Sequence, residues 1–311
     1  DVIVTDHHNP GDKIPETIIL DPKMQDSGYP FPDISGAAVA YKLVQALRFS
    51  KNELYKQDIC LLNVVPVNEA YTIECIKARN LAVKSRLQET IVPGTIDISQ
   101  TKLLPFLNGQ QIFVWDADVT KKLLARIFGS GIEFNLLDLR PQIAKLMPFT
   151  ADKSLLALKD LSKIAHYSEH PATETEGFYN LFVSFVQKQM TMTFKTDTDA
   201  EQNDLQLVML AALADIMPLK DENRIFVKKG LEVINAGKSR PGLLELLSLL
   251  NMLGKRLTAT DIAWNVTPVL NAAGRLGHPE LAIKLFLAES SPERTELAEK
   301  IIALNTERKQ I

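Results

Sequence analysis

Residues 1–12 read DVIVTDHHNPGD, a short apolar run that ends in polar side chains. Residues 2–4 are all β-branched and show no helical spacing, so they predict a buried strand. The strand delivers Asp6, His7 and His8 at its carboxyl end, which is where ligands bind in open α/β sheets. Carboxylate and imidazole are suitable ligands for Mn²⁺, Zn²⁺ and related ions. The alternative is a polar turn in which Asp6 caps and both histidines are solvated, because adjacent side chains leave a strand on opposite faces.

The whole composition narrows the classes of protein that this chain can belong to. Its 311 residues exceed the usual domain size of about 100–200, which predicts two domains. A net charge of −3 excludes a generally basic surface, so nucleic acid would need a local patch of positive charge. Cys60 and Cys75 lack metal-type spacing and indicate free thiols in a reducing, cytoplasmic setting. No apolar run approaches the ~20 residues of a membrane span, so no membrane partner is expected.

The first fifty residues predict a short strand and a helix. Residues 17–20 form the strand, and a helix begins after Ser35 with Val39 and Leu43 on its apolar face. Ser35 is placed to cap this helix, with Gly36 allowing close packing. A second use is possible, because the free N–H groups of a Ser-Gly helix start can bind an anion.

Residues 54–190 form a predicted α/β unit of their own. Segments 58–67, 69–78 and 81–94 alternate like the strands of a meander. Two further strands, within 111–115 and 134–140, then alternate with helices ended or flanked by glycine.

The remaining residues predict helices after a polar connection. The run KTDTDAEQND, residues 195–204, has the composition of a linker. An apolar helix follows over 205–219, and further helical segments continue to the last residue. Both ends of the chain interrupt a predicted element, which indicates a piece of a longer protein.

Two later positions carry residue types suited to chemistry. Asp215 is a lone carboxylate at the end of an apolar run, and a nearly buried Asp is costly unless it is paired, hydrogen-bonded or metal-bound. A turn-capping Asp is the alternative. In Asn271-Ala-Ala-Gly-Arg275, small residues permit close backbone approach and the Arg suits bidentate phosphate contact. The alternative there is a helix end with a solvated Arg.

Taken together, these segments resemble the DHH phosphoesterases, and within them the RecJ family of single-strand-specific 5′→3′ DNA exonucleases. The stretches that carry the resemblance are VIVTDHHNPGD, SGAAVAYKLVQAL, LAALADIMPLKDENRIFVKKGLEVIN, RPGLLELL and LTATDIAWNVTPVLNAAGRLGHPELAIKLFL. They imply an α/β fold, a parallel-sheet DHH-type domain that is incomplete at its N-terminus and interrupted by a second α/β domain. Its first part would span residues 1–53, and its second part 191–311 would end in the start of a linker helix.

The resemblance also implies roles for individual residues. The catalytic residues would be Asp6, His7, His8 and Asp215. Of these, Asp6, His7 and Asp215 would bind metal, and His8 would contact the scissile phosphate or a ligand. Asn271 and Arg275 would hold a substrate phosphate.

The implied reaction is two-metal hydrolysis of single-stranded DNA in repair and recombination. Mn²⁺ is the expected ion and Mg²⁺ the alternative. The family's aspartate-rich motifs before Asp-His-His have no counterpart in residues 1–311, so we expect these residues alone to be inactive and to bind metal weakly.

The interrupting segment, residues 54–190, resembles the DnaQ-like 3′→5′ exonucleases of the ribonuclease H type. Stretches that carry this likeness include LPFLNGQQIFVWDADVTKKLLARIF, FNLLDLRPQIAKLMP, SLLALKDLSKIA and the motif that begins at His170. Active members need four acidic ligands, but Asn63 and Thr120 stand at two of those places. Asp116 and Asp118 lie close by, and Glu174 stands in for the last acid.

The missing acids predict an inactive insertion, which could still bind single strands or a repair protein. Trp115 and Tyr167 could stack on bases, with core packing as the alternative.

Two other functions remain open for the whole chain. One is a DHH-family hydrolase of oligonucleotides or cyclic dinucleotides, against which the LNAAGR and ADIMPL stretches argue. The other is a non-catalytic scaffold that binds nucleic acid, against which the joint presence of Asp6, His7, His8 and Asp215 argues.

Overall fold

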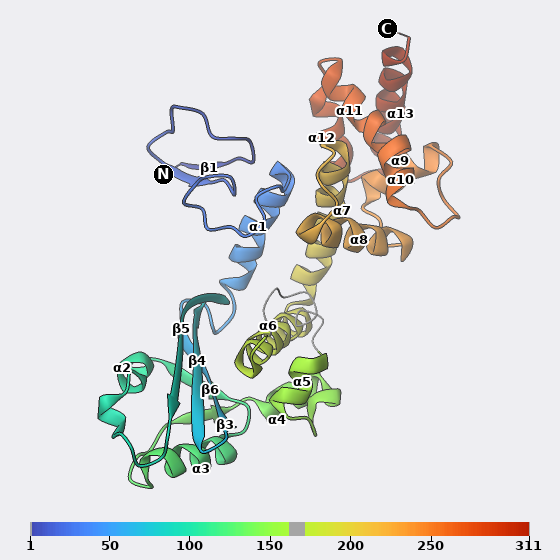
Figure 1. Ribbon diagram of the computed structural model, residues 1–311. Helices are drawn as coiled ribbons and strands as arrows, with labels where there is room; N and C mark the ends of the chain where they lie inside the picture. The colour runs from blue at the N-terminus through green and yellow to red at the C-terminus, as the bar shows by residue number, and fades with distance from the viewer. Residues whose placement is uncertain (1, 162–171, 311) are drawn as a thin grey trace. The chain divides into compact units, whose positions relative to one another are not determined.

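The computed structural model describes residues 2–161 and 172–310, and its backbone divides into two compact units (Figure 1). One unit combines residues 1–48 with 196–311, and we call it the split unit. The other contains residues 49–195, and we call it the inserted unit. The expected divisions, after residues 53 and 190, each lie five residues from these bounds (53 against 48, 190 against 195).

The split unit begins with two short parallel strands, β1 (Ile3–Thr5) and β2 (Ile18–Leu20), in which Val4 lies opposite Ile19. The prediction of a buried first strand is wrong, because Val2 is 66% exposed and Ile3 is 50% exposed. The physical reason is that burial of a β-branched run depends on its neighbours. Among the described residues β1 has a single neighbouring strand, and most of its apolar surface faces solvent.

Helix α1 (Gly36–Phe49) follows, and the predicted cap is confirmed. The hydroxyl of Ser35 accepts a hydrogen bond from the backbone N–H of Ala38 at 3.3 Å. The helix packs into a small apolar core with two later helices of the split unit, and the buried members of this core are Ile34, Ala38, Val39, Tyr41, Val208 and Phe226. This core joins the two sequence segments of the split unit.

Helix α7 (Lys195–Ala214) includes the stretch 195–204, so the prediction of a linker there is wrong. Its polar side chains serve a helix–helix contact. Glu201 accepts hydrogen bonds from Tyr41 at 2.7 Å and from Gln45 at 2.8 Å. Asp204 pairs with Arg48 at 2.8 Å. A polar composition here reflects the partner helix and not a flexible connection.

The rest of the split unit is helical. In order it comprises α8 (Asp221–Asn235), α9 (Pro241–Leu249), α10 (Ala259–Asp261), a π-helical turn (Ile262–Val266), α11 (Thr267–Arg275), α12 (Pro279–Leu287) and α13 (Ser291–Arg308). These helices enclose a core that includes Leu243, Leu246 and Ile301. The glycine of the RPGLLELL stretch, Gly242, is required by packing, because an added Cβ would lie 2.2 Å from the carbonyl oxygen of Leu285. Only glycine lets α9 approach α12 so closely.

The inserted unit is built on a five-stranded sheet with strand order β5-β4-β3-β6-β7. The strands are β3 (Asp58–Val67), β4 (Ala70–Arg79), β5 (Ala82–Ile91), β6 (Gln111–Val114) and β7 (Leu136–Asp138). The predicted meander is confirmed, since β3 pairs with β4 and β4 with β5 in antiparallel fashion. Strands β6 and β7 add to β3 in parallel.

Helices cover both faces of this sheet. They are α2 (Leu103–Leu107), α3 (Ala117–Phe128), α4 (Arg140–Leu146), α5 (Leu155–Leu161) and α6 (Glu174–Thr193), with 3₁₀ turns at Ile98–Gln100 and Pro148–Thr150. Alternate residues of β3 point to opposite faces. Leu61 therefore joins the core under α4, α5 and α6, while Cys60 and Leu62 join the core under α2 and α3.

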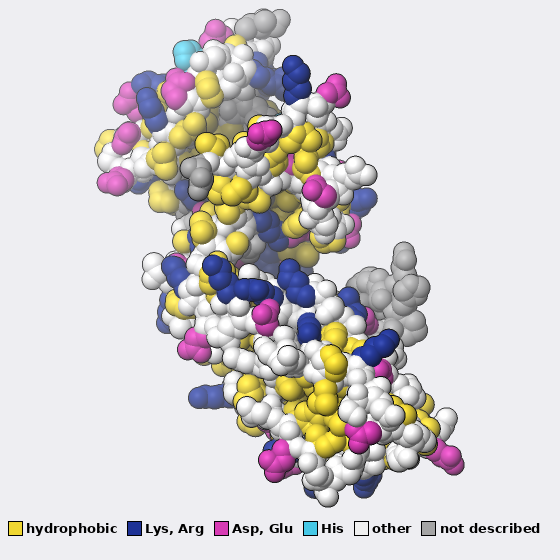
Figure 2. All heavy atoms as spheres, turned by 90° about the vertical axis from the view of Figure 1, so that its left-hand side faces the viewer, with side chains coloured by type: hydrophobic (Ala, Val, Ile, Leu, Met, Phe, Trp, Pro, Cys, Tyr) yellow, Lys and Arg dark blue, Asp and Glu magenta, His cyan; other side chains and the backbone are white. Residues whose placement is uncertain are grey.

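The surface agrees with the small net charge. On the face drawn in Figure 2, basic and acidic side chains are intermingled and apolar side chains are exposed between them. Within residues 2–161 and 172–310, no helix has the length and apolar character needed to cross a membrane.

Candidate functional site

Asp6 forms a compact turn at the end of β1. Its backbone N–H donates to the carbonyl of Leu20 at 3.1 Å, which holds the turn against β2. One carboxylate oxygen, Oδ1, accepts the N–H groups of His7 at 2.7 Å and His8 at 3.2 Å, and lies 2.7 Å from Nδ1 of His8. The hydrogen bond with the His8 ring, followed by the two backbone N–H groups, lowers the pKa of Asp6 to about 2. The carboxylate is therefore ionised at neutral pH.

His7 packs against the start of α1. An added Cβ on Gly36 would lie 3.1 Å from Cδ2 of the His7 ring, so a side chain larger than hydrogen would press on that ring. The His7 and His8 rings lie with centroids 4.3 Å apart. Of the two uses considered for the Ser35-Gly36 pair, capping with close packing is the one that the geometry displays.

Asp215 directly follows the last residue of α7 and is exposed, so the expectation of a nearly buried carboxylate is wrong. The chain leaves the helix through a left-handed residue, Ile216, with φ of 53°. The N–H of Met217 then donates to the carbonyl of Ala212 at 2.9 Å, a bond typical of helix ends that reverse direction. This reversal turns the Asp215 side chain toward solvent.

The side chain of Asn223 connects the segment before α1 with the segment after Asp215. Sequence reasoning missed this residue. Its amide Nδ2 donates to the carbonyl of Asp33 at 2.7 Å and to that of Pro218 at 3.1 Å. Asp33 precedes the start of α1 that supports His7, and Pro218 follows Asp215. The side chain is completely buried, and its Oδ1 has no hydrogen-bond partner. One buried amide therefore ties both segments together.

A sequence signal for Asn223 does exist. Residue 223 lies three residues before Phe226, seven before Gly230 and eleven before Ile234, which is the spacing of one helix face. All four positions are buried. An amide in such an apolar stripe needs internal hydrogen-bond partners, so its position in the sequence indicates a structural role.

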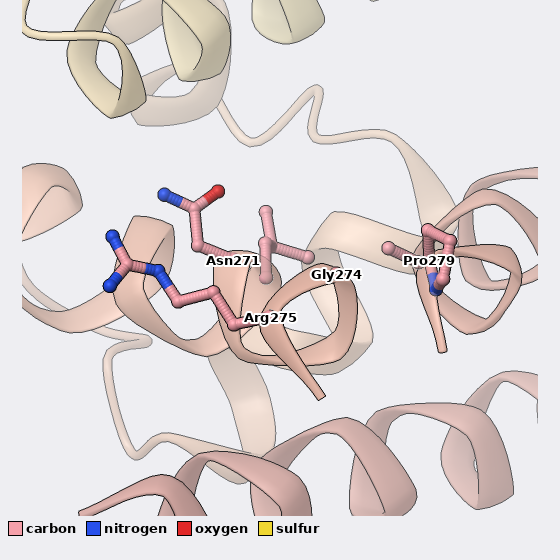
Figure 3. Close-up of a pocket in the computed structure, with 6 residues that line it drawn as sticks. Asn271, Gly274, Arg275 and Pro279 are labelled. Carbon is pink, nitrogen blue, oxygen red and sulfur yellow. The ribbon is translucent and has the colours of Figure 1, made fainter. Parts of the chain in front are cut away.

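Helix α11 carries the predicted phosphate-binding residues. Figure 3 shows the Asn271 and Arg275 side chains extending from the same side of this helix. They line a cavity of about 300 Å³ together with Leu270, Gly274, Pro279 and Ala282. A second cavity of about 190 Å³ shares Leu270 and Asn271, and reaches Ala211 and Ala214 of α7. Asn271 thus lies between Arg275 and the last turn before Asp215.

The structure does not gather the predicted metal ligands into one group. Among the described residues, no three His, Cys, Asp or Glu side chains come together in a way that could hold a metal ion. The carboxylate of Asp6 is instead engaged by His7 and His8. The roles assigned to Asp6, His7, His8 and Asp215 therefore remain predictions.

In the inserted unit, the residues at the expected acidic positions have structural partners. Asn63 donates to Glu174 at 3.3 Å. Thr120 is buried, and its hydroxyl donates to the backbone carbonyl of Asp116 at 2.7 Å. Asp116 caps α3 by accepting the N–H of Val119 and also pairs with Arg140 at 3.3 Å. Each of these contacts stabilises the fold, and the part of this unit that the structure describes holds no group of three His, Cys, Asp or Glu side chains that could bind a metal.

Trp115 is not available to a nucleic acid in this structure. It is only 6% exposed, and its indole N–H donates to the carbonyl of Lys153 at 3.0 Å. Its ring meets Phe178 edge-on. Core packing, the alternative to base stacking, is therefore its use. Tyr167 and the beginning of the motif at His170 lie outside the described residues.

Comparison with known proteins gives a partial match. No protein-family model matches the chain. Over 107 residues it is 41% identical to the single-stranded-DNA-specific exonuclease RecJ of Escherichia coli, which covers 34% of this chain and 18% of that protein. Part of the chain is homologous to RecJ. Against RecJ of Haemophilus influenzae the identity is 32% over 153 residues, or 49% of this chain and 27% of the relative.

Both curated relatives are therefore much longer than the stretch they share with this chain. Solved structures of RecJ from Thermus thermophilus also give partial superpositions. The complex with Mg²⁺ has 34% identity and a TM-score of 0.32 over 35% of this chain and 17% of its own. The complex with Mn²⁺ has 21% identity and a TM-score of 0.33 over 67% of this chain and 30% of its own.

Proposed function

We propose that the split unit is part of a RecJ-type exonuclease that releases nucleotides from the 5′ end of single-stranded DNA, in repair and recombination. The observation that carries this proposal is the 41% identity over 107 residues to a single-stranded-DNA-specific exonuclease. The arrangement of α11 supports it, because a guanidinium and an amide extend from one side of the helix into a shared cavity.

Arg275 and Asn271 are the proposed phosphate-binding pair. The planar guanidinium of arginine matches the oxygens of a phosphate with two parallel hydrogen bonds. Neither side chain has a hydrogen-bond partner among the described residues that would compete for it. Gly274 also lines the cavity and has no side chain that would fill it.

We propose a divalent metal as cofactor, with Mn²⁺ expected and Mg²⁺ as the alternative. The solved RecJ structures contain one or the other ion. Asp6, His7 and Asp215 are the proposed ligands, and His8 is the proposed contact to the scissile phosphate. In this structure these side chains do not form a three-ligand group, so the residues described do not by themselves fit a complete metal centre.

We propose that the inserted unit is a DnaQ-like, ribonuclease H-type domain without catalytic activity. The meander of β3, β4 and β5, extended by two strands parallel to β3, supports the fold. The bonds of Asn63 and Thr120 at expected acidic positions support the loss of activity. Its remaining role would be to bind single strands or a repair protein.

One observation favours a second function, a non-catalytic scaffold that binds nucleic acid. It is the lack of a three-ligand group among the described residues. A scaffold would keep the phosphate contact at Arg275 and release no product.

A nuclease assay on the whole natural protein distinguishes these functions. Single-stranded DNA labelled at either end is incubated with Mn²⁺, with Mg²⁺ or with EDTA. We expect mononucleotides from the 5′ end, dependent on metal and reduced at least tenfold by Arg275→Ala. The control is Arg126→Ala, an exposed arginine on α3 of the inserted unit. Cleavage of dinucleotides alone would favour the oligonucleotide hydrolase, and binding without cleavage would favour the scaffold.

A further inference from the structure

Trp264 is an exposed tryptophan. It lies in the π-helical turn directly before α11, and 76% of its surface is exposed. Among the described residues its ring and its indole N–H make no ring contact or hydrogen bond. A tryptophan normally gains free energy by burying its large apolar surface. Exposure on a well-packed helix therefore indicates a surface that contacts something else.

The position of Trp264 relative to the phosphate-binding pair is fixed by one continuous helical segment. Asn271 lies seven residues further on and Arg275 eleven, and all three residues are exposed. The opposite face of the segment is buried through Ile262, Val266, Val269, Ala272 and Ala273. Trp264, Asn271 and Arg275 therefore share the exposed face, with about 16 Å of helix axis between the first and the last.

We propose that Trp264 is a stacking platform for a base of the single-stranded DNA whose phosphate contacts Arg275. This inference rests on the proposed function and adds a second contact to it. An aromatic ring and a guanidinium on one face supply the two contacts that single strands need, stacking for a base and positive charge for the backbone. The separation of about 16 Å places the stacked base a few nucleotides from the bound phosphate.

A base fits this position better than an apolar protein partner. The next residue, Asn265, is exposed and donates to the carbonyl of Asp261, and Gly274 on the same segment is also exposed. A protein interface needs a wider apolar patch around its aromatic anchor. A single ring beside polar atoms, with an arginine further along the same exposed face, is an arrangement that binds single-stranded nucleic acid. Stacking on it would be tolerant of base identity, because every base has a π face.

The π-helical turn gives a physical reason for the position of Trp264 on the exposed face. Such turns are rare and occur mostly at functional positions, because they insert an extra residue into a helix. Here the turn spans Ile262–Val266 with Trp264 at its centre. Ile262 and Val266 stay in the core, so the added residue is accommodated on the exposed side.

Fluorescence tests the contact directly, because the chain has two tryptophans. The Trp115→Phe variant of the whole protein leaves Trp264 as the reporter within this chain, and oligodeoxythymidylate in EDTA is the probe. We expect saturable quenching. The matched variant Trp264→Phe, which leaves Trp115, should show no quenching. Normal DNA binding by Trp115→Phe without any change in emission would overturn the proposal.

Affinity measures the size of the contact. Stacking of one base is worth about 5- to 150-fold in affinity. Trp264→Ala should weaken binding within this range and raise KM while kcat changes little, and Trp264→Phe should restore most of the loss. Because the ring is exposed, the alanine variant should keep the thermal stability of the parent. Unchanged affinity and KM in the alanine variant would overturn the proposal.

An abasic scan separates this proposal from the proposed function. In the parent protein, one abasic position in the substrate should lose about as much affinity as Trp264→Ala. The same abasic substrate should cost the alanine variant nothing further. If the protein never cleaves DNA, the exonuclease proposal fails while quenching still decides the stacking. If it cleaves DNA and the two losses simply add at every position, the stacking proposal fails alone.

Discussion

In the split unit, the side chains of Asp215 and Arg275 reach solvent without a side-chain hydrogen bond among the described residues. In the inserted unit, by contrast, Asp116 caps α3 and pairs with Arg140. The two tryptophans differ in the same way, since Trp115 is buried and hydrogen-bonded whereas Trp264 is exposed. The difference shows that residue type alone does not mark a site. A functional candidate is a chemically suitable side chain that the fold leaves available.

The largest expected effect comes from Asn223→Ala. It would remove both hydrogen bonds of a buried amide and leave the carbonyl of Asp33 without this partner, whereas the carbonyl of Pro218 keeps the N–H of Lys220 at 2.9 Å. An unsatisfied buried group costs about 1–3 kcal/mol, so the free energy of unfolding should fall by about 1–3 kcal/mol. Urea denaturation measures this free energy. Asn180→Ala, a partly exposed helical amide of the inserted unit, should change it by less than 1 kcal/mol. Equal changes in the free energy of unfolding for the two variants would contradict the structural role of Asn223.

Gly36→Ala should act on activity more than on stability. The added Cβ would press on the His7 ring at about 3.1 Å, and the ring must move. If His7 serves the reaction, kcat/KM on single-stranded DNA should fall about tenfold, which equals about 1.4 kcal/mol in the transition state. The control is Gly131→Ala in the inserted unit, where an added Cβ meets nothing within 4 Å. Full activity of the Gly36 variant would show that the position of the His7 ring is unimportant.

Ile216→Gly should stabilise the protein. A β-branched residue in the left-handed region costs about 1–2 kcal/mol, and Ile216 is almost fully exposed, so it loses little packing. After the entropy of glycine is subtracted, a net gain of about 0.5–1 kcal/mol is expected in urea denaturation. Leu81 has a similar φ of 60° but packs against the core of the inserted unit. Leu81→Gly should therefore destabilise, and a gain there would contradict this explanation.

The smallest expected effect concerns Asp261. Hydrogen bonds from Thr258 and then from Lys255 lower its pKa to about 2, from the ordinary 3.8. A depressed pKa adds stability above pH 3.8, which is lost as the pH falls through about 2. Stability measured between pH 4 and pH 2 should therefore fall less steeply in Asp261→Asn than in the parent. Asp97 of the inserted unit is the N-cap of another capping box, whereas Asp261 is the third residue of its own, and the pKa of Asp97 is also lowered, so Asp97→Asn should change the slope in the same direction. Identical slopes in parent and variants would contradict both assignments.

Much of the secondary structure was predictable from local pattern. The alternation of residues 58–91 predicts three strands, and the structure has β3, β4 and β5 there. Ser35 predicts a cap and supplies one. In each case the signal and the structure are both local, because a strand shows its period and a cap lies within a few residues of its target.

What depends on distant neighbours was not predictable. The acidic run 195–204 becomes helix because α1 supplies Tyr41 and Arg48 as partners. The β-branched run of β1 stays exposed because its environment, and not its composition, decides burial. For the candidate site, residue types and their places at element ends were predictable. Which of these side chains contact one another was not predictable, because a hydrogen bond such as that from Asn223 to Asp33 joins residues 190 positions apart.

The central claim is that nuclease activity depends on exposed side chains of the split unit and not on the hydrogen-bonded acidic residues of the inserted unit. The most direct measurement compares Asp215→Asn with Asp116→Asn in the whole protein. Nucleotide release from 5′-labelled single-stranded DNA in Mn²⁺ is the readout. We predict that Asp215→Asn abolishes release and that Asp116→Asn leaves it unchanged after correction for folded protein. Full activity of the Asp215 variant, or loss of activity in the Asp116 variant alone, would contradict the claim.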